Sequence, residues 1–286
     1  MPIYISQEDT DSQQYREKHM VKGLYTAYTG MVNEQKRLDT ITNNLANAST
    51  TGYKKEALVA QSFDEKLAIK IKDTSSFNNQ PEAIGNIVFG VKVGETWTNW
   101  EEGAIKVTDN PYDVALTDTG FFAIEYTNKA GETSIKYTRD GSFTVDSEGY
   151  LRTVDGDYVL NAEGALTSQY GEDYRIRVNP DLTPDIASDG TIYQDGQQVA
   201  QIGIIDIDNY DYINKYGDNL YDLIDGGNIV ATDTKLKQGC LESSNVKVVD
   251  EMVDMIEIAR AYEAGQKMIQ TEDSSLDKAV NSVGRV

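Results

Sequence analysis

Apolar residues recur every seven positions near the start of the chain. Leu24, Met31, Leu38 and Leu45 form one row, and Ala27, Ile41 and Ala48 fill most of the interleaved row, which Glu34 alone breaks. Polar residues occupy the remaining positions. This pattern predicts a helix over residues 24–48 with one narrow apolar seam. The sequence Ser-Thr-Thr-Gly at residues 49–52 predicts where that helix ends.

The C-terminal segment carries a second narrow seam. Its members are Val249, Met252, Ile256, Ala259, Tyr262, Ile269, Leu276 and Val283. The spacing shortens around Ala259, which resembles a stammer that would overwind a coiled coil. Asp250 and Glu251 place negative charge in the first turns, where the helix dipole favours it. We expect a helix from about residue 246 to 283, roughly 55 Å long.

A coiled coil between the N-terminal and C-terminal helices accounts for both seams. Because the seams are narrow and contain small or polar residues, a single pair of helices buries little apolar surface. One interpretation is an intramolecular hairpin that closes the chain on itself. The other is that the helices also pack against copies of themselves in an oligomer. The periodicity alone leaves both open.

The middle of the chain alternates apolar and polar residues in short runs. Such runs cover residues 121–125, 134–138, 142–145, 150–154 and 158–160, with Asp140-Gly141, Glu148-Gly149 and Asp155-Gly156 between the last four. Asp-Gly between alternating runs is typical of a β-hairpin. A second β-rich stretch covers residues 191–206. We therefore predict an α+β fold, with terminal helices around a central antiparallel β domain that is a small barrel or sandwich.

These patterns divide the chain into five parts. We expect a disordered leader at 1–19, an N-terminal helical segment at 20–52 and a connecting segment at 53–95. A β-rich acidic domain follows at 96–240, and a C-terminal helix at 241–286.

Charge and composition exclude several functions. The 286 residues carry a net charge of -21, of which -18 lies within residues 73–240, so a nucleic-acid or anionic-membrane partner is not expected. With one cysteine, Cys240, and one histidine, His19, a disulfide or a Cys/His zinc site lacks its parts. We interpret Cys240 as a small buried residue. No apolar stretch is long enough to span a membrane.

The sequence also offers no positive sign of catalysis. Carboxylate pairs carry no information in so acidic a segment. Asp206, Asp208 and Asp211 hint at a calcium loop, but Asp211 stands where the loop needs glycine and Gly217 where it needs glutamate. We predict no catalytic residue, no cofactor and no metal.

Three groups of motifs resemble the bacterial flagellar basal-body rod and hook protein family. The first is GLYTAYTGM at 23–31 with RLDTITNNLAN at 37–47 and TTGYK at 50–54. In the middle stand NPYDVA at 110–115, GFF at 120–122, YTRDGSF at 137–143 and GDNLY at 217–221. The last is LESSNV at 241–246 with RAYE at 260–263. The match is better to the distal rod and related rod proteins than to the longer hook protein.

The resemblance implies a structural subunit of the flagellar rod. Members are exported without a cleaved signal peptide by the flagellar type III apparatus and assemble helically, with terminal helices inside and β domains outside. Partners would be copies of the chain and other rod and hook proteins. Members commonly start near the GLY string, so residues 1–19 look like an extra leader, for which a misassigned start codon is our preferred explanation.

We assign helical assembly to the two seams. Leu24, Met31, Leu38, Ile41 and Leu45 would face Val249, Met252, Ile256, Tyr262, Ile269 and Leu276. Asn43, Asn44 and Asn47 would be polar contacts that fix register, or would merely cap the helix end. Two alternatives are a hook or hook-associated subunit and, in a different class, a secreted acidic β-rich carbohydrate-binding protein or enzyme.

Overall fold

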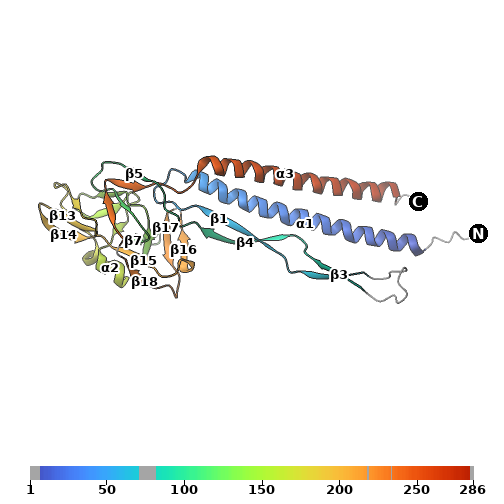
Figure 1. Cartoon of the computed structure of the whole chain (residues 1–286), viewed down its shortest axis with the longest axis horizontal. Coiled ribbons are helices and arrows are strands. Elements are labelled where there is room, and N and C mark those ends of the chain that lie inside the picture. The colour runs from blue at the N-terminus through green and yellow to red at the C-terminus, as the bar shows by residue number, and fades with distance from the viewer. Residues whose placement is uncertain (1–6, 71–81, 218, 233, 284–286) are drawn as a thin grey trace, which may run out of the picture. The chain divides into compact units, whose positions relative to one another are not determined.

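A computed structural model describes residues 7–70, 82–217, 219–232 and 234–283 of the chain (Figure 1). The chain divides into two compact units. Unit 1 combines residues 1–45, 56–98 and 248–286, and unit 2 combines residues 46–55 and 99–247. Each unit is therefore assembled from segments that are distant in the sequence.

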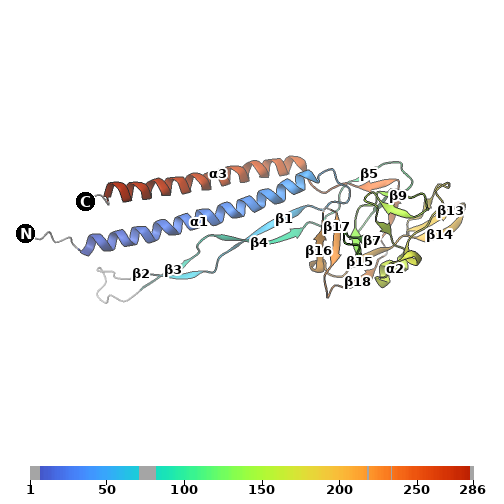
Figure 2. The same cartoon turned by 180° about the vertical axis from the view of Figure 1, so that it is seen from behind.

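Two long helices dominate unit 1 and confirm the predicted terminal helices. They are α1 (Gln7–Ala46) and α3 (Val248–Lys278), and the π-helical turn η3 (Ala279–Val283) continues α3. Figures 1 and 2 show α1 and α3 side by side. Residues 7–19 are helical, where the sequence predicted a disordered leader, because neither proline nor glycine interrupts them. Residues 1–6 lie outside the described part.

Residues 56–98 form strands, although we expected only a connecting segment from 53 to 95. The strands are β1 (Glu56–Ser62), β2 (Lys66–Lys70), β3 (Glu82–Ile87) and β4 (Val91–Thr98). β1 pairs with β4 and β2 pairs with β3, both antiparallel. No side chain of β1 or β4 is fully buried, so neither strand shows the alternation of buried apolar and exposed polar residues that signals a strand in the sequence.

Unit 2 contains the predicted β-rich region. Its strands are β5 (Ile105–Val107), β6 (Val114–Leu116), β7 (Phe121–Thr127), β8 (Thr133–Thr138), β9 (Phe143–Val145), β10 (Leu151–Thr153), β11 (Tyr158–Val159), β12 (Asp185–Ile186), β13 (Thr191–Gln194), β14 (Gln197–Gln201), β15 (Ile204–Ile207), β16 (Ile213–Tyr216), β17 (Leu220–Leu223), β18 (Ile229–Ala231), β19 (Leu236–Gln238) and β20 (Cys240–Glu242). The helix α2 (Ala162–Thr167) and the short turns η1 (Glu172–Tyr174) and η2 (Tyr210–Tyr212) interrupt them. Every strand pairing among the described residues is antiparallel.

Two of the three predicted hairpin turns are confirmed. Glu148-Gly149 joins β9 to β10 and Asp155-Gly156 joins β10 to β11, and both strand pairs are hydrogen-bonded. The hairpin predicted at Asp140-Gly141 is wrong, because β8 pairs with β7 and β17 rather than with β9. A Cβ atom at Gly141 would lie 1.7 Å from the carbonyl oxygen of Val114. Glycine is needed there for a close backbone approach.

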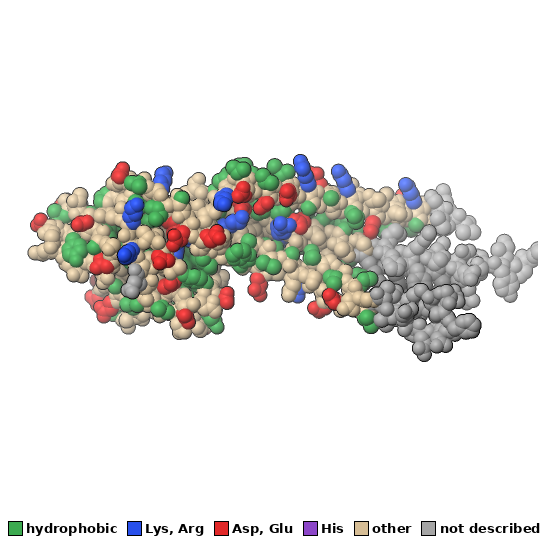
Figure 3. Space-filling view, viewed as in Figure 1, with side chains coloured by type: hydrophobic (Ala, Val, Ile, Leu, Met, Phe, Trp, Pro, Cys, Tyr) green, Lys and Arg blue, Asp and Glu red, His purple; other side chains and the backbone are tan. Residues whose placement is uncertain are grey.

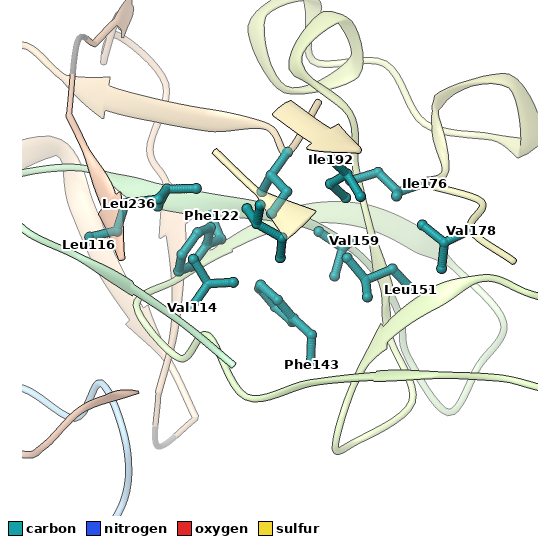
Figure 4. Close-up of a cluster of buried hydrophobic side chains, with 12 residues drawn as sticks. Val114, Leu116, Phe122, Phe143, Leu151, Val159, Ile176, Val178, Ile192 and Leu236 are labelled. Carbon is teal, nitrogen blue, oxygen red and sulfur yellow. The ribbon is translucent and has the colours of Figure 1, made fainter. Parts of the chain in front are cut away.

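The core of unit 2 consists of two clusters of buried apolar side chains. One cluster gathers residues from many strands around Phe122 and Phe143, whose rings meet edge to face (Figure 4). The second surrounds Phe121, Tyr137 and Tyr221. Cys240 is 2% exposed, which confirms it as a buried residue.

The first strands of unit 2 pair with its last. β6 pairs with β19, and β5 pairs with β20, so that Ile105 lies opposite Glu242. The chain therefore closes unit 2 at the point where it leaves for α3.

Candidate functional site

A buried carboxylate holds three segments of unit 2 together. Lys54 Nζ lies 2.6 Å from Glu242 Oε1, and an Arg139 Nη1 nitrogen lies 3.3 Å from Glu242 Oε2. All three side chains are at most 3% exposed. They come from the three motif groups near residues 50–54, 137–143 and 241–246, which the fold thus brings to one place.

Backbone groups complete this charge cluster of Lys54, Arg139 and Glu242. The Gly103 N–H donates to Glu242 Oε1 at 2.8 Å, and Lys54 Nζ donates to the carbonyl of Glu101 at 2.8 Å. Burial lowers the pKa of Lys54, and the neighbouring Arg139 lowers it further against the opposing effect of Glu242. Because the cluster is closed to solvent, a substrate has no access to the Lys54 amine. Its role is structural, since a buried charge is tolerated only with its partners in place.

Asn245 forms three hydrogen bonds beside the charge cluster, in the region of unit 2 where residues 52–55 meet residues 242–245. We call this region the junction. The Oδ1 of Asn245 accepts from the Lys55 N–H at 2.7 Å, and its Nδ2 donates to the carbonyls of Asn99 and Glu101 at 2.9 and 3.0 Å. The Gly52 N–H also donates to the Glu242 carbonyl at 2.9 Å. Residues 52–55, which follow the N-terminal helix, are thereby tied to residues 242–245, which precede the C-terminal one.

In unit 1, the predicted seam of α1 lies in a partly covered stripe. Leu24, Met31, Leu38, Ile41 and Leu45 are all half-buried. A Cβ atom at Gly265 of α3 would lie 2.6 Å from Met31 Cγ, so the glycine lets the two helices approach closely. Gly23 of α1 likewise lies close to the side chain of Glu272, and Asn44 is hydrogen-bonded to Glu251. Together with the Met31–Gly265 contact, these pairs define one antiparallel register for α1 and α3.

The covered stripe of α3 differs in part from its predicted seam. It follows alternating steps of four and three residues through Glu251, Met255, Ile258, Tyr262, Gly265, Ile269, Glu272 and Leu276, all of which are buried or half-buried. Tyr262, Ile269 and Leu276 were predicted and lie in this stripe. Val249, Met252 and Ile256 do not, because they point out of the helix pair. The predicted seam therefore combined residues of two different stripes of α3. The short spacing at Ala259 marks the change from one stripe to the other and is not a stammer in a single seam.

The outer stripe of α3 is apolar and exposed. We give this name to Val249, Met252, Val253 and Ile256, which are 72%, 48%, 50% and 53% exposed. Figure 3 shows hydrophobic side chains gathered over the first turns of α3. Contiguous apolar patches are typical of surfaces that contact another macromolecule.

The three asparagines near the end of α1 differ in their surroundings. Asn44 is fully buried: its Nδ2 donates to the Glu56 carbonyl at 2.8 Å and to Glu251 Oε2 at 3.3 Å, and its Oδ1 accepts from the Glu56 N–H at 3.0 Å. Asn47 is half-buried and accepts a hydrogen bond from Thr50 Oγ1 at 3.0 Å, as a residue at a helix end does. Asn43 is exposed. Asn44 thus joins α1, β1 and α3.

The described residues offer little to a metal or a membrane. In the ranges that the structure describes, no three His, Cys, Asp or Glu residues are grouped so that they could hold a metal ion. Within that same part of the chain, no helix is both long and apolar enough to cross a bilayer. The side chain of His19 lies outside the described part.

Known protein families match three regions of the chain. Residues 24–54 match a family described as flagella basal body rod protein, and residues 237–282 match the flagellar basal body rod FlgEFG protein C-terminal region. Residues 115–199 match the flagellar hook protein FlgE/F/G D1 domain. The first two matches contain the junction segments around Lys54 and Glu242.

Whole-length relatives agree with these regions. The chain is 34% identical over 269 residues to the flagellar basal-body rod protein FlgF of Caulobacter vibrioides, covering 93% of this chain and 100% of the relative. It is 32% identical over 272 residues to the rod protein FlgG of Bacillus subtilis, covering 92% and 99%. It is 30% identical over 283 residues to the hook-basal body complex protein FlhO of the same organism, covering 93% and 100%.

The fold and the site are those of a structural protein. Buried hydrogen bonds and ion pairs hold the junction of unit 2 together, and the outer stripe of α3 is exposed. The comparisons give that class its family. The chain belongs to the flagellar basal-body rod proteins.

Proposed function

We propose that the chain is a structural subunit of the bacterial flagellar rod, that it has no catalytic role, and that it assembles helically through its terminal helices. The observation that carries this proposal is the outer stripe of α3. Burying a fully exposed aliphatic side chain contributes about 1.5–3 kcal/mol, and these side chains, which are about half exposed or more, still have roughly half of that or more to gain against a partner. Four of them on neighbouring turns supply a large part of the free energy of a subunit contact.

The proposed arrangement gives each helical face its own task. Within the subunit, α1 and α3 wind as a coiled coil through Leu24, Met31, Leu38, Ile41 and Leu45 on one side and Tyr262, Ile269 and Leu276 on the other. Between subunits, Val249, Met252 and Ile256 contact the helices of the next copy. Such head-to-tail contacts do not close into a dimer but continue as a helical tube.

The family membership supports the location and partners that we propose. The subunit would lie in the basal body of the flagellum, beside other rod proteins and the hook, and would reach it through the flagellar export apparatus without a cleaved signal peptide. The names of the relatives favour a rod subunit over a hook subunit, since FlgF and FlgG are described as rod proteins. They also disfavour a carbohydrate-binding protein or an enzyme.

The substitution Ile256→Asp tests the proposal. It places a charge in the outer stripe and leaves every residue of the covered stripe of α3 unchanged. We expect the purified variant to stay monomeric at concentrations at which the parent protein forms sedimenting assemblies. In a rod-deficient cell it should fail to restore motility.

Val154→Asp is the matched control, because Val154 is 71% exposed on a turn of unit 2. It introduces the same charge at another exposed aliphatic residue and should leave assembly unchanged. Full motility with Ile256→Asp would show that the outer stripe has no part in assembly.

A further inference from the structure

The β1–β4 ribbon displays a second apolar surface, separate from the outer stripe of α3. Ala57 lies directly opposite Trp97 across the ribbon. Val59 is two residues further along β1, beside a register irregularity that falls between Leu58 and Ala60. Alternate residues of a strand share one face, which places Glu95 of β4 on the same face as Trp97. Trp97 and Val59 are each 51% exposed. We call the face formed by Ala57, Val59 and Trp97 the tryptophan face.

Contacts with α1 hold the ribbon but do not cover this face. The backbone of Glu56 is bonded to Asn44, the ring of Phe63 lies 6.2 Å from that of Tyr25, and Gly90 lies against Thr29. A two-stranded ribbon is marginally stable by itself, so covering its open side would stabilise it. Tryptophan is also the residue type most enriched among the energetically dominant positions of protein interfaces.

Charge favours another copy of this chain as the covering partner. The only charged residues of β1 and β4 are Glu56, Lys92 and Glu95, whereas residues 73–240 as a whole carry a net charge of -18. Two chains of net charge -21 repel each other least where their surfaces are nearly neutral. The tryptophan face, with Glu95 as its one carboxylate, is such a surface.

The layers of unit 1 favour the same partner. α1 lies between α3 and the β1–β4 ribbon (Figures 1 and 2), so the outer stripe and the tryptophan face belong to different layers. Two different patches on one subunit are what an open, head-to-tail assembly requires. We propose that the tryptophan face is a contact surface for a second copy of this chain, in addition to the outer stripe. This inference rests on the proposed self-assembly.

Tryptophan fluorescence tests the inference directly, because the chain has only two tryptophans. The variant Trp100→Phe keeps Trp97 alone. Its matched control, Trp97→Phe, keeps Trp100, whose ring packs 5.4 Å from Phe121 and 5.0 Å from Tyr221 inside unit 2. On assembly, Trp97 emission should move to shorter wavelength and its quenching by acrylamide should fall. Trp100 should change little.

Three results would overturn the inference. Trp97 could keep its emission and quenching in sedimenting assemblies, which would leave the proposed rod function standing. It could already be shielded in the dilute monomer, which would mean that the chain covers this face itself. If the parent protein formed no assemblies at any concentration, the proposed function would fail together with the inference.

Substitution supplies an independent measurement. Trp97→Ala should raise the critical concentration for assembly roughly tenfold or more, as expected when a central interface tryptophan is truncated. Val154→Ala, an aliphatic truncation on the surface of unit 2, should not change it. Circular dichroism of the dilute variants controls for folding. Equal critical concentrations for the two variants would rule out a role of Trp97 in the contact.

Discussion

Unit 1 and unit 2 use their apolar residues in opposite ways. In unit 2, Phe121, Phe122 and Ile124 on β7 are fully buried, and even its charged cluster is closed to solvent. In unit 1, the helix pair covers one stripe of half-buried residues, while the outer stripe of α3 stays open. Unit 2 therefore completes its core within one chain. Unit 1 leaves apolar side chains of α3 exposed.

This difference separates stability from association. A change inside unit 2 should unfold it, whereas a change on the open faces of unit 1 should leave the monomer intact and weaken assembly. Three predictions examine the stability side, from the largest expected effect to the smallest.

Glu242→Gln should have the largest effect. It leaves Lys54 and Arg139 as buried cations without a counter-charge, and breaking a buried ion pair costs about 3–5 kcal/mol. Urea unfolding followed by Trp100 fluorescence, in the Trp97→Phe background, measures the loss. Asp146→Asn removes the partly exposed pair with Arg152 at 2.7 Å and should cost at most about 1 kcal/mol. Similar losses in both variants would mean that Glu242 does not hold unit 2 together.

The same leucine-to-alanine change in each unit compares the two kinds of packing. Leu151 is 2% exposed in the core of unit 2, so Leu151→Ala should cost about 2–5 kcal/mol. Leu38 is only half-buried on α1, and Leu38→Ala should cost roughly 1 kcal/mol. Hydrogen exchange resolved by segment measures each loss in its own unit. A larger loss for Leu38→Ala would reverse our view of which unit is tightly packed.

Asn44→Asp should destabilise the contact between the end of α1, the start of β1 and the first turn of α3. Aspartate cannot donate to the Glu56 carbonyl or to Glu251, and it adds a second carboxylate beside Glu251. Losing a buried donor costs about 1–3 kcal/mol. Faster amide exchange in β1 and the first turns of α3 would report it, and acidification should restore part of the protection. Asn43→Asp makes the same change at the exposed neighbour, and equal exchange in both variants would contradict a special role of Asn44.

Periodicity predicted the elements whose side chains have one covered and one open face. The seam of α1 was found because Leu24, Met31, Leu38 and Leu45 repeat regularly, and most strands of unit 2 were found from their alternation. The two stripes of α3 were merged into one seam because both contain apolar residues at helical spacing. Only the packing of α1 on one of them distinguishes Ile258 from Ile256.

Contacts between distant segments could not be predicted from local patterns. The β1–β4 ribbon was missed because few of its side chains are well covered. Lys54, Arg139 and Glu242 are ordinary charged residues in the sequence, and nothing local marks them as buried. Their position inside three separate family motifs was the one available signal, since a charge placed within such a motif is a candidate for a structural role.

The pairing of β5 with β20 and β6 with β19 has a kinetic consequence. Strands near residue 105 cannot find their partners until the chain has been completed to residue 242, so the loop to be closed spans most of unit 2. Folds dominated by such distant contacts form slowly, within about milliseconds to seconds. A chain that emerges N-terminus first would thus be unable to close unit 2 until residue 242 has emerged. It would gain its rigid form only when its last strands arrive.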